Sequence, residues 1–311
     1  MLVDVHQHLL GEPLIAQLTR RKAPPMLIPR RRGWTFRISG EPDTVLSPTA
    51  VDPAARGDQL RRDEVDRALV ALSTALGIEL LPAEEAWPLL EAYHRGLDSL
   101  PAGFGAWGSV QLEFPDPAEV DAVIDRGFVG LTLPAAALLD PRGLERVGPL
   151  LSRLESRNAP LFVHPGPVVA ADPGDGATAL PPWWPAVTDY VAQMQAAWFA
   201  FLHAGRRAHP RLRVLFAMYA GGAPLQIERF AARGGTPPAE PDPLVFYDTS
   251  SYGPKMLEAM AGAVGLAQLV YGSDRPVLGG GAPALGPELT RLLRDANPHR
   301  LLAPDQEGAP R

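Results

Sequence analysis

Eight short apolar runs, rich in valine, leucine and phenylalanine, alternate along the chain with longer amphipathic stretches. The runs span residues 2–5, 67–72, 103–110, 128–133, 160–163, 213–217, 244–247 and 268–271. None of them alternates strictly between polar and apolar residues, which is typical of strands that are buried on both faces. The alternation with helices predicts an α/β protein with a (β/α)8 TIM barrel, and a doubly wound open sheet is the alternative.

Two long segments interrupt this pattern. Residues 20–61 are dense in proline, glycine and arginine, and they are too long for a simple turn between a strand and a helix. We expect them to form an inserted lid or subdomain after strand 1, over the carboxyl ends of the strands, where barrel active sites lie. Residues 165–185 form a second long loop at the same face. We expect residues 1–302 to form one barrel domain and residues 303–311 to form a flexible C-terminal tail.

The composition excludes several classes of protein. The net charge of -6 argues against a nucleic-acid partner, because such partners usually require a basic surface. The chain has no cysteine, so a metal would have to be held by histidine, aspartate or glutamate. There is no apolar run of about 18 residues, and the N-terminus lacks the layout of a signal peptide. We therefore expect a cytoplasmic protein that binds a small-molecule substrate and neither nucleic acid nor membrane.

Side chains that can bind a metal lie at the ends of three predicted strands. Asp4, His6 and His8 share one face of the first strand, because successive side chains alternate between faces. The two imidazoles can converge on one metal ion, with Asp4 supporting them from below. His164 ends the fifth run and Asp274 follows the eighth, so in a closed barrel all these ends face one cavity. Hydrogen-bonded interior histidines and a helix-capping aspartate are the alternatives.

Five short motifs follow one another along the chain. They are Asp-Val-His-Gln-His at 4–8, Gly-Phe-Val-Gly-Leu at 127–131, Phe-Val-His-Pro-Gly at 162–166, Ala-Gly-Gly-Ala-Pro-Leu at 220–225 and Gly-Ser-Asp-Arg-Pro at 272–276. In this order the motifs resemble the amidohydrolase-2 branch of the amidohydrolase superfamily, which contains metal-dependent hydrolases and decarboxylases. The resemblance extends from residue 4 to residue 276 and so covers nearly the whole chain.

The resemblance implies a metal site and a reaction. The residues that would bind one divalent ion, with Zn²⁺ as the expected metal, are His6, His8, His164 and Asp274. In some relatives a carboxylated lysine at the end of the fourth strand bridges two metals. Here residues 131–133 read Leu-Thr-Leu, which favours a single metal. Metal-bound water would attack a small amide, lactone or ester carbonyl, with Asp274 moving the proton.

Tyr219 occupies a position at which the family normally has a histidine, two residues before the paired glycines. A tyrosine is a poor general base at neutral pH, but it can donate a hydrogen bond to a developing oxyanion. We therefore expect Asp274 and Tyr219 to be the catalytic residues of a hydrolase. The alternatives are a non-oxidative decarboxylase of an aromatic or unsaturated carboxylic acid, and a metal-binding barrel that has lost catalysis.

Four residues in the two long segments are candidates for binding the substrate. Arg32 would bind a carboxylate through its guanidinium group, and three tryptophans would stack on a ring or line an apolar pocket: Trp34, Trp183 and Trp184. A solvated run of charges and packing of the loop are the alternatives. Homodimers are usual among related proteins, which makes a homodimer the assembly to test.

Overall fold

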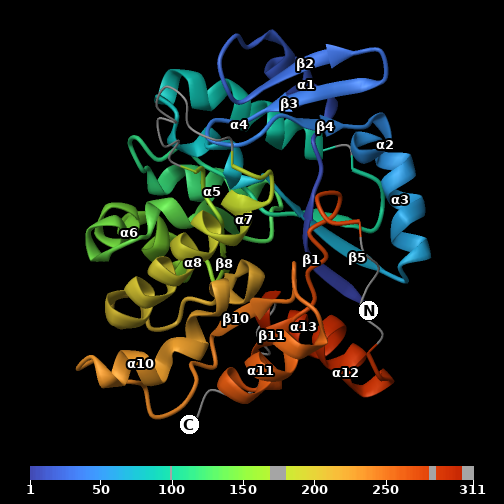
Figure 1. The fold of residues 1–311 in the computed structure, drawn as a ribbon. Coiled ribbons are helices and arrows are strands. Elements are labelled where there is room, and N and C mark those ends of the chain that lie inside the picture. Colours follow the sequence, from blue (N-terminus) through green and yellow to red (C-terminus); the bar gives the residue numbers. More distant parts are fainter. Residues whose placement is uncertain (99, 169–179, 280–284, 303–311) are drawn as a thin grey trace.

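Eight parallel strands, paired as one sheet of three and one sheet of five, are arranged as a barrel in the computed structural model, which describes residues 1–98, 100–168, 180–279 and 285–302. Around the barrel they follow one another in sequence order: β1 (Val3–His8), β5 (Arg67–Ala71), β6 (Phe104–Ala106), β7 (Leu131–Pro134), β8 (Leu161–His164), β9 (Val214–Phe216), β10 (Val245–Asp248) and β11 (Leu269–Val270). Backbone hydrogen bonds join the two sheets at both junctions: Val5 N donates to Tyr271 O at 3.0 Å, and Thr132 N donates to Gly108 O at 2.8 Å. Each strand overlaps one of the apolar runs, so the prediction of a (β/α)8 barrel is confirmed (Figure 1).

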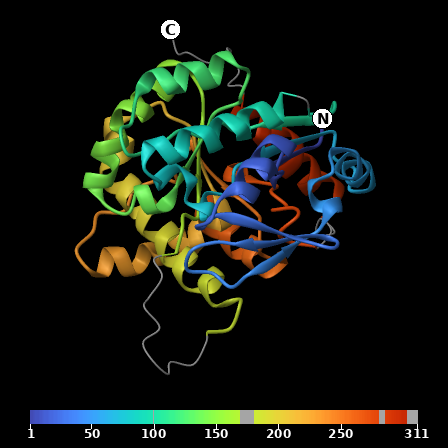
Figure 2. The same ribbon diagram turned by 90° about the horizontal axis from the view of Figure 1, so that it is seen from above.

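Helices surround the strands, as Figures 1 and 2 show. Outside the insert they are α1 (Glu12–Arg20), α4 (Ala83–Leu97), α5 (Pro117–Asp125), α6 (Pro141–Ser156), α7 (Trp184–Val187), α8 (Asp189–Ala200), α9 (Arg206–Ala208), α10 (Ile227–Ala232), α11 (Pro254–Val264), α12 (Pro287–Arg291) and α13 (Asn297–Leu302). π-Helical turns at Phe201–Gly205 and Leu292–Ala296 continue α8 and α12.

Helix α6 shows how the sequence specifies these elements. The Asp140 carboxylate accepts a hydrogen bond from Gly143 N at 2.8 Å, and Pro141 occupies the first helical position. Both features favour a helix start, because the first amide groups of a helix have no partner within it. The buried side chains recur every three or four residues and so form one apolar face: Leu144, Val147, Leu150, Leu151 and Leu154.

The residues between α1 and β5 form an inserted unit at one end of the molecule, drawn in blue in Figure 1. It contains an antiparallel sheet of β2 (Met26–Arg30), β3 (Gly33–Arg37) and β4 (Thr44–Leu46), followed by α2 (Pro48–Val51) and α3 (Pro53–Arg62). Arg56 of α3 is buried, and it donates hydrogen bonds to His8 O at 2.8 Å and to Gln7 Oε1 at 2.5 Å. The insert is therefore attached to the carboxyl end of β1.

Most of the buried apolar side chains belong to one hydrophobic cluster that joins the strands to the surrounding helices. Within the described ranges, no helix combines the length and the apolar composition that crossing a membrane requires. Residues 303–311, for which the sequence predicts a flexible tail, lie outside the described residues.

Glu79 is a buried acid in the 3-10 turn Ile78–Leu80, beyond the end of β5. Its Oε1 accepts a hydrogen bond from Ser109 Oγ at 2.7 Å, whereas Oε2 has no partner among the described residues. Burial raises the pKa of Glu79 to about 7, and the single hydrogen bond from Ser109 opposes this shift only in part. The folded chain therefore retains a proton on Glu79 at pH values where an unfolded chain would have lost it.

The free energy of unfolding of the wild type should fall as the pH rises from 4.5 to 7. We predict that Glu79→Gln does not show this fall. Over this range the folded state holds the proton and the unfolded state does not, so the free energy of unfolding falls with rising pH. The difference in the free energy of unfolding between the wild type and the variant should change by about 3 kcal/mol between pH 4.5 and pH 7. Urea unfolding at several pH values measures this difference. Glu258→Gln, at an exposed glutamate of α11, is the matched control. Parallel stability curves for Glu79→Gln and the wild type would contradict this account.

Candidate metal centre

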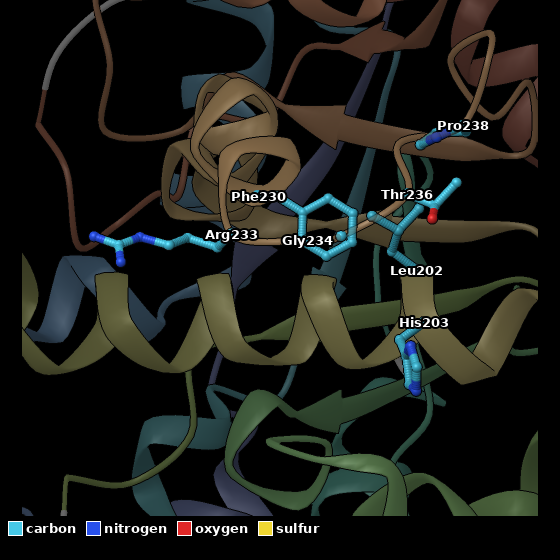
Figure 3. Close-up of a pocket in the computed structure, with 8 residues that line it drawn as sticks. Leu202, His203, Phe230, Arg233, Gly234, Thr236 and Pro238 are labelled. Atoms are coloured by element: carbon cyan, nitrogen blue, oxygen red, sulfur yellow. The ribbon is translucent and has the colours of Figure 1, made fainter.

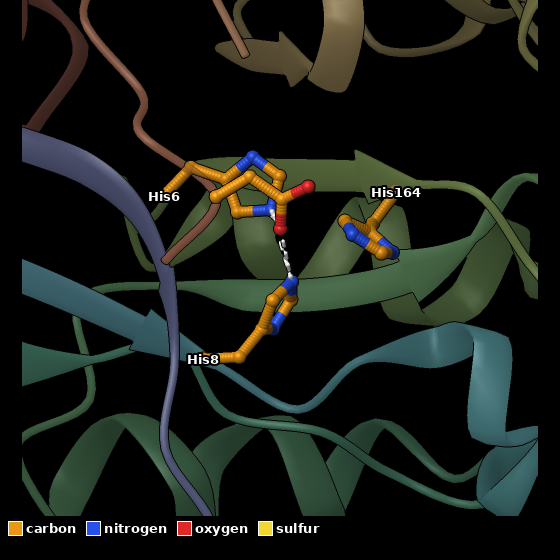
Figure 4. A group of neighbouring side chains, drawn as sticks. His6, His8 and His164 are labelled. Carbon is orange, nitrogen blue, oxygen red and sulfur yellow. Dashed lines mark hydrogen bonds and ion pairs between the residues drawn. The ribbon is translucent and has the colours of Figure 1, made fainter. Parts of the chain in front are cut away.

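Four side chains from three parts of the barrel meet at the carboxyl ends of its strands. His6 and His8 come from β1, His164 ends β8, and Asp274 follows β11 (Figure 4). One nitrogen or oxygen of each residue lies within 4.8 Å of those of the others. The three imidazole rings are mutually equidistant, with 5.0 Å between each pair of centroids and interplanar angles between 83° and 89°. The structure thus brings together all four predicted metal ligands.

The outer nitrogens of His6 and His8 are held by hydrogen bonds. His6 Nδ1 lies 2.7 Å from Asp248 Oδ2, and His8 Nδ1 lies 2.9 Å from Ala71 O. Because a carboxylate and a carbonyl only accept hydrogen bonds, each Nδ1 carries the proton. The lone pairs of the neutral rings are then on the two Nε2 atoms, which lie 3.2 Å apart. Two acceptors at this distance are unfavourable unless a proton or a cation lies at the site.

His164 has the same arrangement. Its Nδ1 lies 3.0 Å from Pro165 O and 2.9 Å from Thr74 Oγ1, which belongs to the turn after β5. The Thr74 hydroxyl donates to Pro165 O at 2.6 Å, so it can accept from the imidazole. The proton is therefore on Nδ1 here too, and the Nε2 of a neutral His164 is a free ligand atom.

The donor set fits a divalent metal ion. Three imidazole nitrogens and one carboxylate oxygen are ligands that Zn²⁺ and similar ions bind. Asp274 Oδ1 is buried and has no hydrogen-bond partner among the described residues, although it lies 3.1 Å from His8 Nε2 and 3.6 Å from His6 Nε2. A buried carboxylate oxygen without a donor costs free energy, and a cation at this position would offset that cost.

Asp248 supports the site, and the sequence did not single it out. It ends β10 and is fully buried. While Oδ2 accepts from His6, Oδ1 accepts from Met218 N at 2.9 Å, Ser250 N at 2.9 Å and Ser250 Oγ at 2.5 Å. Its position directly after the seventh apolar run could have identified it as a candidate, since His164 and Asp274 also lie at strand ends. Asp248 therefore orients His6 as a carboxylate partner of a metal-binding histidine does.

Buried charges shift the pKa values of these residues in opposite directions. Burial lowers the pKa of His6, but the Asp248 carboxylate, with smaller effects of Asp274 and Asp4, raises it to about 9. Burial raises the pKa of Asp248, and the interaction with His6 more than offsets this, leaving the pKa below its usual value. Burial lowers the pKa of His164 far below its usual range, and His6 and His8 add to that effect. In the metal-free protein His6 thus holds a positive charge at neutral pH.

Asp4 lies beneath the histidines, where the sequence placed a supporting carboxylate. It accepts hydrogen bonds from Gln7 Nε2 at 2.8 Å, Ser273 N at 3.0 Å and His6 N at 3.2 Å. Asp4 therefore does not contact an imidazole nitrogen. Instead it ties β1 to the backbone just before Asp274, and so fixes the two ligand-bearing segments relative to each other.

A close approach of the backbone at Gly272 completes this packing. A Cβ atom at Gly272 would lie 2.8 Å from the Cβ of His6 and 3.0 Å from that of Asp248. Real side chains do not come this close, so the position needs glycine. The glycine of the Gly-Ser-Asp motif is thus required for steric reasons, and the aspartate for its chemistry.

Tyr219 is fully buried, and its hydroxyl has no partner in the described part of the chain. It belongs to a run of five residues, from Met218 to Gly222, whose φ angles lie between 44° and 74°. Burial, with a smaller effect of Asp248, raises the pKa of the Tyr219 hydroxyl. Its ring lies 5.5 Å from that of Tyr252. The hydroxyl therefore stays protonated at neutral pH and is free to donate a hydrogen bond.

The four predicted substrate-binding residues lie in different surroundings. Arg32 is exposed in the turn between β2 and β3, and Trp34 of β3 is half-buried. Trp183 and Trp184 are 56% and 38% exposed, with their rings 5.6 Å apart. Among the described residues, no hydrogen bond, ion pair or ring contact joins any of the four to the metal ligands. Their role in binding a substrate remains a prediction.

A contact between the insert and the barrel does approach the site. The Tyr190 hydroxyl, in the first turn of α8, donates a hydrogen bond to the Glu41 carboxylate in the turn between β3 and β4. Asp274 is one of the charges that raise the pKa of Tyr190, after burial and Glu41. One turn further along α8, Gln193 accepts from Gly166 N at 3.0 Å, in the loop that follows His164. No sequence motif pointed to this pair.

Comparison with protein-family models gave no match, and comparison with curated protein sequences gave none either. Solved structures, in contrast, resemble the chain over nearly its whole length. IDCase from Metarhizium anisopliae has a TM-score of 0.79 at 17% identity, with 99% of this chain and 98% of that chain covered. A 5-carboxyvanillate decarboxylase from Novosphingobium aromaticivorans, in complex with manganese and 4-hydroxy-3-methoxy-5-nitrobenzoic acid, has a TM-score of 0.74 at 15% identity, covering 97% and 96%.

A putative amidohydrolase from Staphylococcus aureus has a TM-score of 0.69 at 13% identity, covering 97% of this chain and 99% of that chain. At these identities the similarity concerns the fold. It agrees with the family resemblance of the five motifs, since hydrolase and decarboxylase names both occur among the similar structures. The chain therefore shares its fold with proteins that are named as IDCase, as a 5-carboxyvanillate decarboxylase and as a putative amidohydrolase.

Proposed function

We propose that the chain is a divalent-metal-dependent enzyme of the amidohydrolase-2 type, and that it removes a carboxyl group from a small aromatic or unsaturated acid without oxidation. The arrangement of the three histidines carries this proposal. Each Nδ1 is held by an acceptor, so the Nε2 atoms of His6, His8 and His164 are available as ligands next to Asp274 Oδ1. Such acceptors are the usual partners of metal-binding histidines.

The solved structures favour decarboxylation over the hydrolysis that the sequence suggested first. One similar protein is a 5-carboxyvanillate decarboxylase that contains manganese and a substituted benzoic acid. The tyrosine at position 219, where the family normally has a histidine, does not distinguish the two reactions, because either of them would lose a base there. The manganese in that structure also makes Mn²⁺ a candidate beside Zn²⁺, because the same N and O ligands bind both.

The chain's own residues supply a site for the proton as well as for the metal. When bound, a divalent ion supplies positive charge that polarises carboxylate oxygens of a substrate. In decarboxylation the bond between the substrate carbon and the carboxyl carbon breaks, CO₂ leaves, and a proton adds to the substrate carbon. We assign delivery of that proton to Asp274 Oδ2, which would take it up from water before it passes it to the substrate carbon. The Asp274 side chain is 15% exposed, against 2% for His6 and 7% for His8, so it is the most accessible of these three.

Tyr219 has a different part in this scheme. Its raised pKa excludes it as a base at neutral pH, and it also makes the hydroxyl a weak acid. We propose that it donates a hydrogen bond to negative charge on the substrate, which needs no proton transfer. The unpartnered hydroxyl and the left-handed backbone that holds it support this role, because strained conformations of this kind cluster at functional sites.

The metal-free protein should bind one Mn²⁺ or Zn²⁺ per chain, which calorimetry and elemental analysis measure. His164→Ala removes a ligand, so metal affinity should fall by more than the roughly 10–100-fold that changes to outer partners cause. His203→Ala, at an exposed histidine of the π-helical turn after α8, should bind metal as the wild type does. Undiminished binding by His164→Ala would show that the four residues are not the metal site.

Asp248→Asn tests the carboxylate that orients His6. In the wild type, protons compete with metal for His6 below pH 9, so metal affinity should rise with pH up to about 9. The variant lacks the charge that raises the His6 pKa, so its affinity should level off at a lower pH. At pH 9 it should also be about 10–100-fold weaker than the wild type. Ser250→Ala, which keeps the carboxylate, should level off close to the wild-type pH; identical pH curves for Asp248→Asn and the wild type would refute this role.

The metal-loaded enzyme should release CO₂ from one or more acids of a panel that contains 5-carboxyvanillate and hydroxybenzoates. Asp274→Asn should reduce this rate by about 10²–10⁴-fold, the range for loss of a positioned acid. Asp52→Asn, at the exposed cap of α3, is the control. Cleavage of esters or lactones without CO₂ release would instead support hydrolysis. Full metal occupancy without turnover in either panel would indicate a barrel that has lost catalysis.

A further inference from the structure

A groove lies between α8 and α10, and Figure 3 shows residues that line one part of it. It consists of two adjoining hollows of about 530 and 560 Å³, which share His203, Phe230 and Arg233. Volumes of this size are in the range of sites for small organic ligands. None of the four metal ligands lines either hollow, so the groove is separate from the site described above.

The lining of the groove is basic and aromatic. Arg229 and Arg233 are exposed, and neither forms an ion pair among the described residues. The rings of Phe199 and Phe230 lie 5.5 Å apart and form an apolar wall. Asp140 is the one acid in the lining, and its Oδ1 is already bonded to a backbone amide as the cap of α6. The charge and the rings together match an anion attached to an aromatic ring.

The groove lies where helix α8 changes its winding. The π-helical turn Phe201–Gly205 has one more residue per turn, which changes the direction of the side chains that follow α8. His203 lies in this turn and lines both hollows. Gly205 is needed here, because a Cβ atom would lie 2.3 Å from the Phe201 ring. Single π-helical turns of this kind often mark functional sites.

One wall of the groove is hydrogen-bonded to the support of the metal site. Gln195 lines the second hollow, and its Nε2 donates to Gly221 O at 2.8 Å. Gly221 belongs to the left-handed run that begins at Met218. Met218 N donates to Asp248, which holds His6. A ligand that displaces Gln195 would therefore act on the same segment that fixes Asp248.

We propose that this groove binds a small aromatic anion, such as a ring that carries a carboxylate or sulfonate, as an effector of the metal site. The two exposed arginines bind the anionic group and the phenylalanine rings contact the aromatic ring. Gln195 transmits occupancy of the groove to the left-handed run. The binding part of this inference stands without the proposed function, whereas the coupling part rests on the metal site.

The probe for the binding part is 1-anilinonaphthalene-8-sulfonate, whose fluorescence rises in an apolar site. The wild type should bind it at one site per chain, and Arg229→Gln combined with Arg233→Gln should weaken binding by about 10-fold or more. Arg207→Gln, at an exposed arginine outside the groove, should leave binding unchanged. Equal affinity of the double variant and the wild type, or a crystal structure with the probe elsewhere, would overturn the site.

The coupling is measured as the affinity for Mn²⁺ with and without saturating probe. It should differ by about 5-fold or more in the wild type, and Gln195→Leu should abolish the difference while it still binds the probe. An unchanged Mn²⁺ affinity in the wild type would overturn the coupling. A protein that binds the probe through the two arginines but binds no Mn²⁺ would refute the proposed function and the coupling, and would confirm the groove as a binding site alone.

Discussion

The buried carboxylate of Asp248 is the group on which the rest of the site depends. An isolated carboxylate without exposure to water is very unfavourable, and this one is stabilised by four hydrogen bonds, from His6, the Met218 amide and both donors of Ser250. These donors come from β1, from the segment after β9 and from the segment after β10. One charge thereby fixes three neighbouring parts of the barrel rim, including His6, the first of the candidate metal ligands.

The same hydrogen bonds explain how a strained backbone persists after β9. Met218, Tyr219 and Ala220 all have positive φ angles, although each has a side chain, and such residues cost about 1–2 kcal/mol each in this conformation. The bond from Met218 N to Asp248 fixes the start of the run, and the bond from Gln195 to Gly221 fixes its end. Hydrogen bonds thus stabilise the strained backbone near both of its ends. This backbone places Tyr219 just beyond the end of β9.

The barrel and the ligand set could be predicted from sequence because both depend on short-range patterns. Runs of valine, leucine and phenylalanine mark buried strands, and a histidine or aspartate at the end of such a run lies at the barrel rim. Asp248, Arg56 and Thr74 were not found, because each acts through a partner far away in sequence. Arg56 in particular lies in a polar segment rich in arginine, where only the folded structure shows that its side chain is buried against β1.

The charges at the candidate site imply that a proton and a metal ion would compete there. Asp248 and Asp274 bring two negative charges next to three imidazoles, and without a metal the protonated His6 balances only one of them. A divalent ion would balance both once His6 has released its proton. A substrate carboxylate would then add an unbalanced negative charge to a largely buried site. Loss of that charge as neutral CO₂, with uptake of a proton, would restore the balance, which is an electrostatic argument for the decarboxylation proposed above.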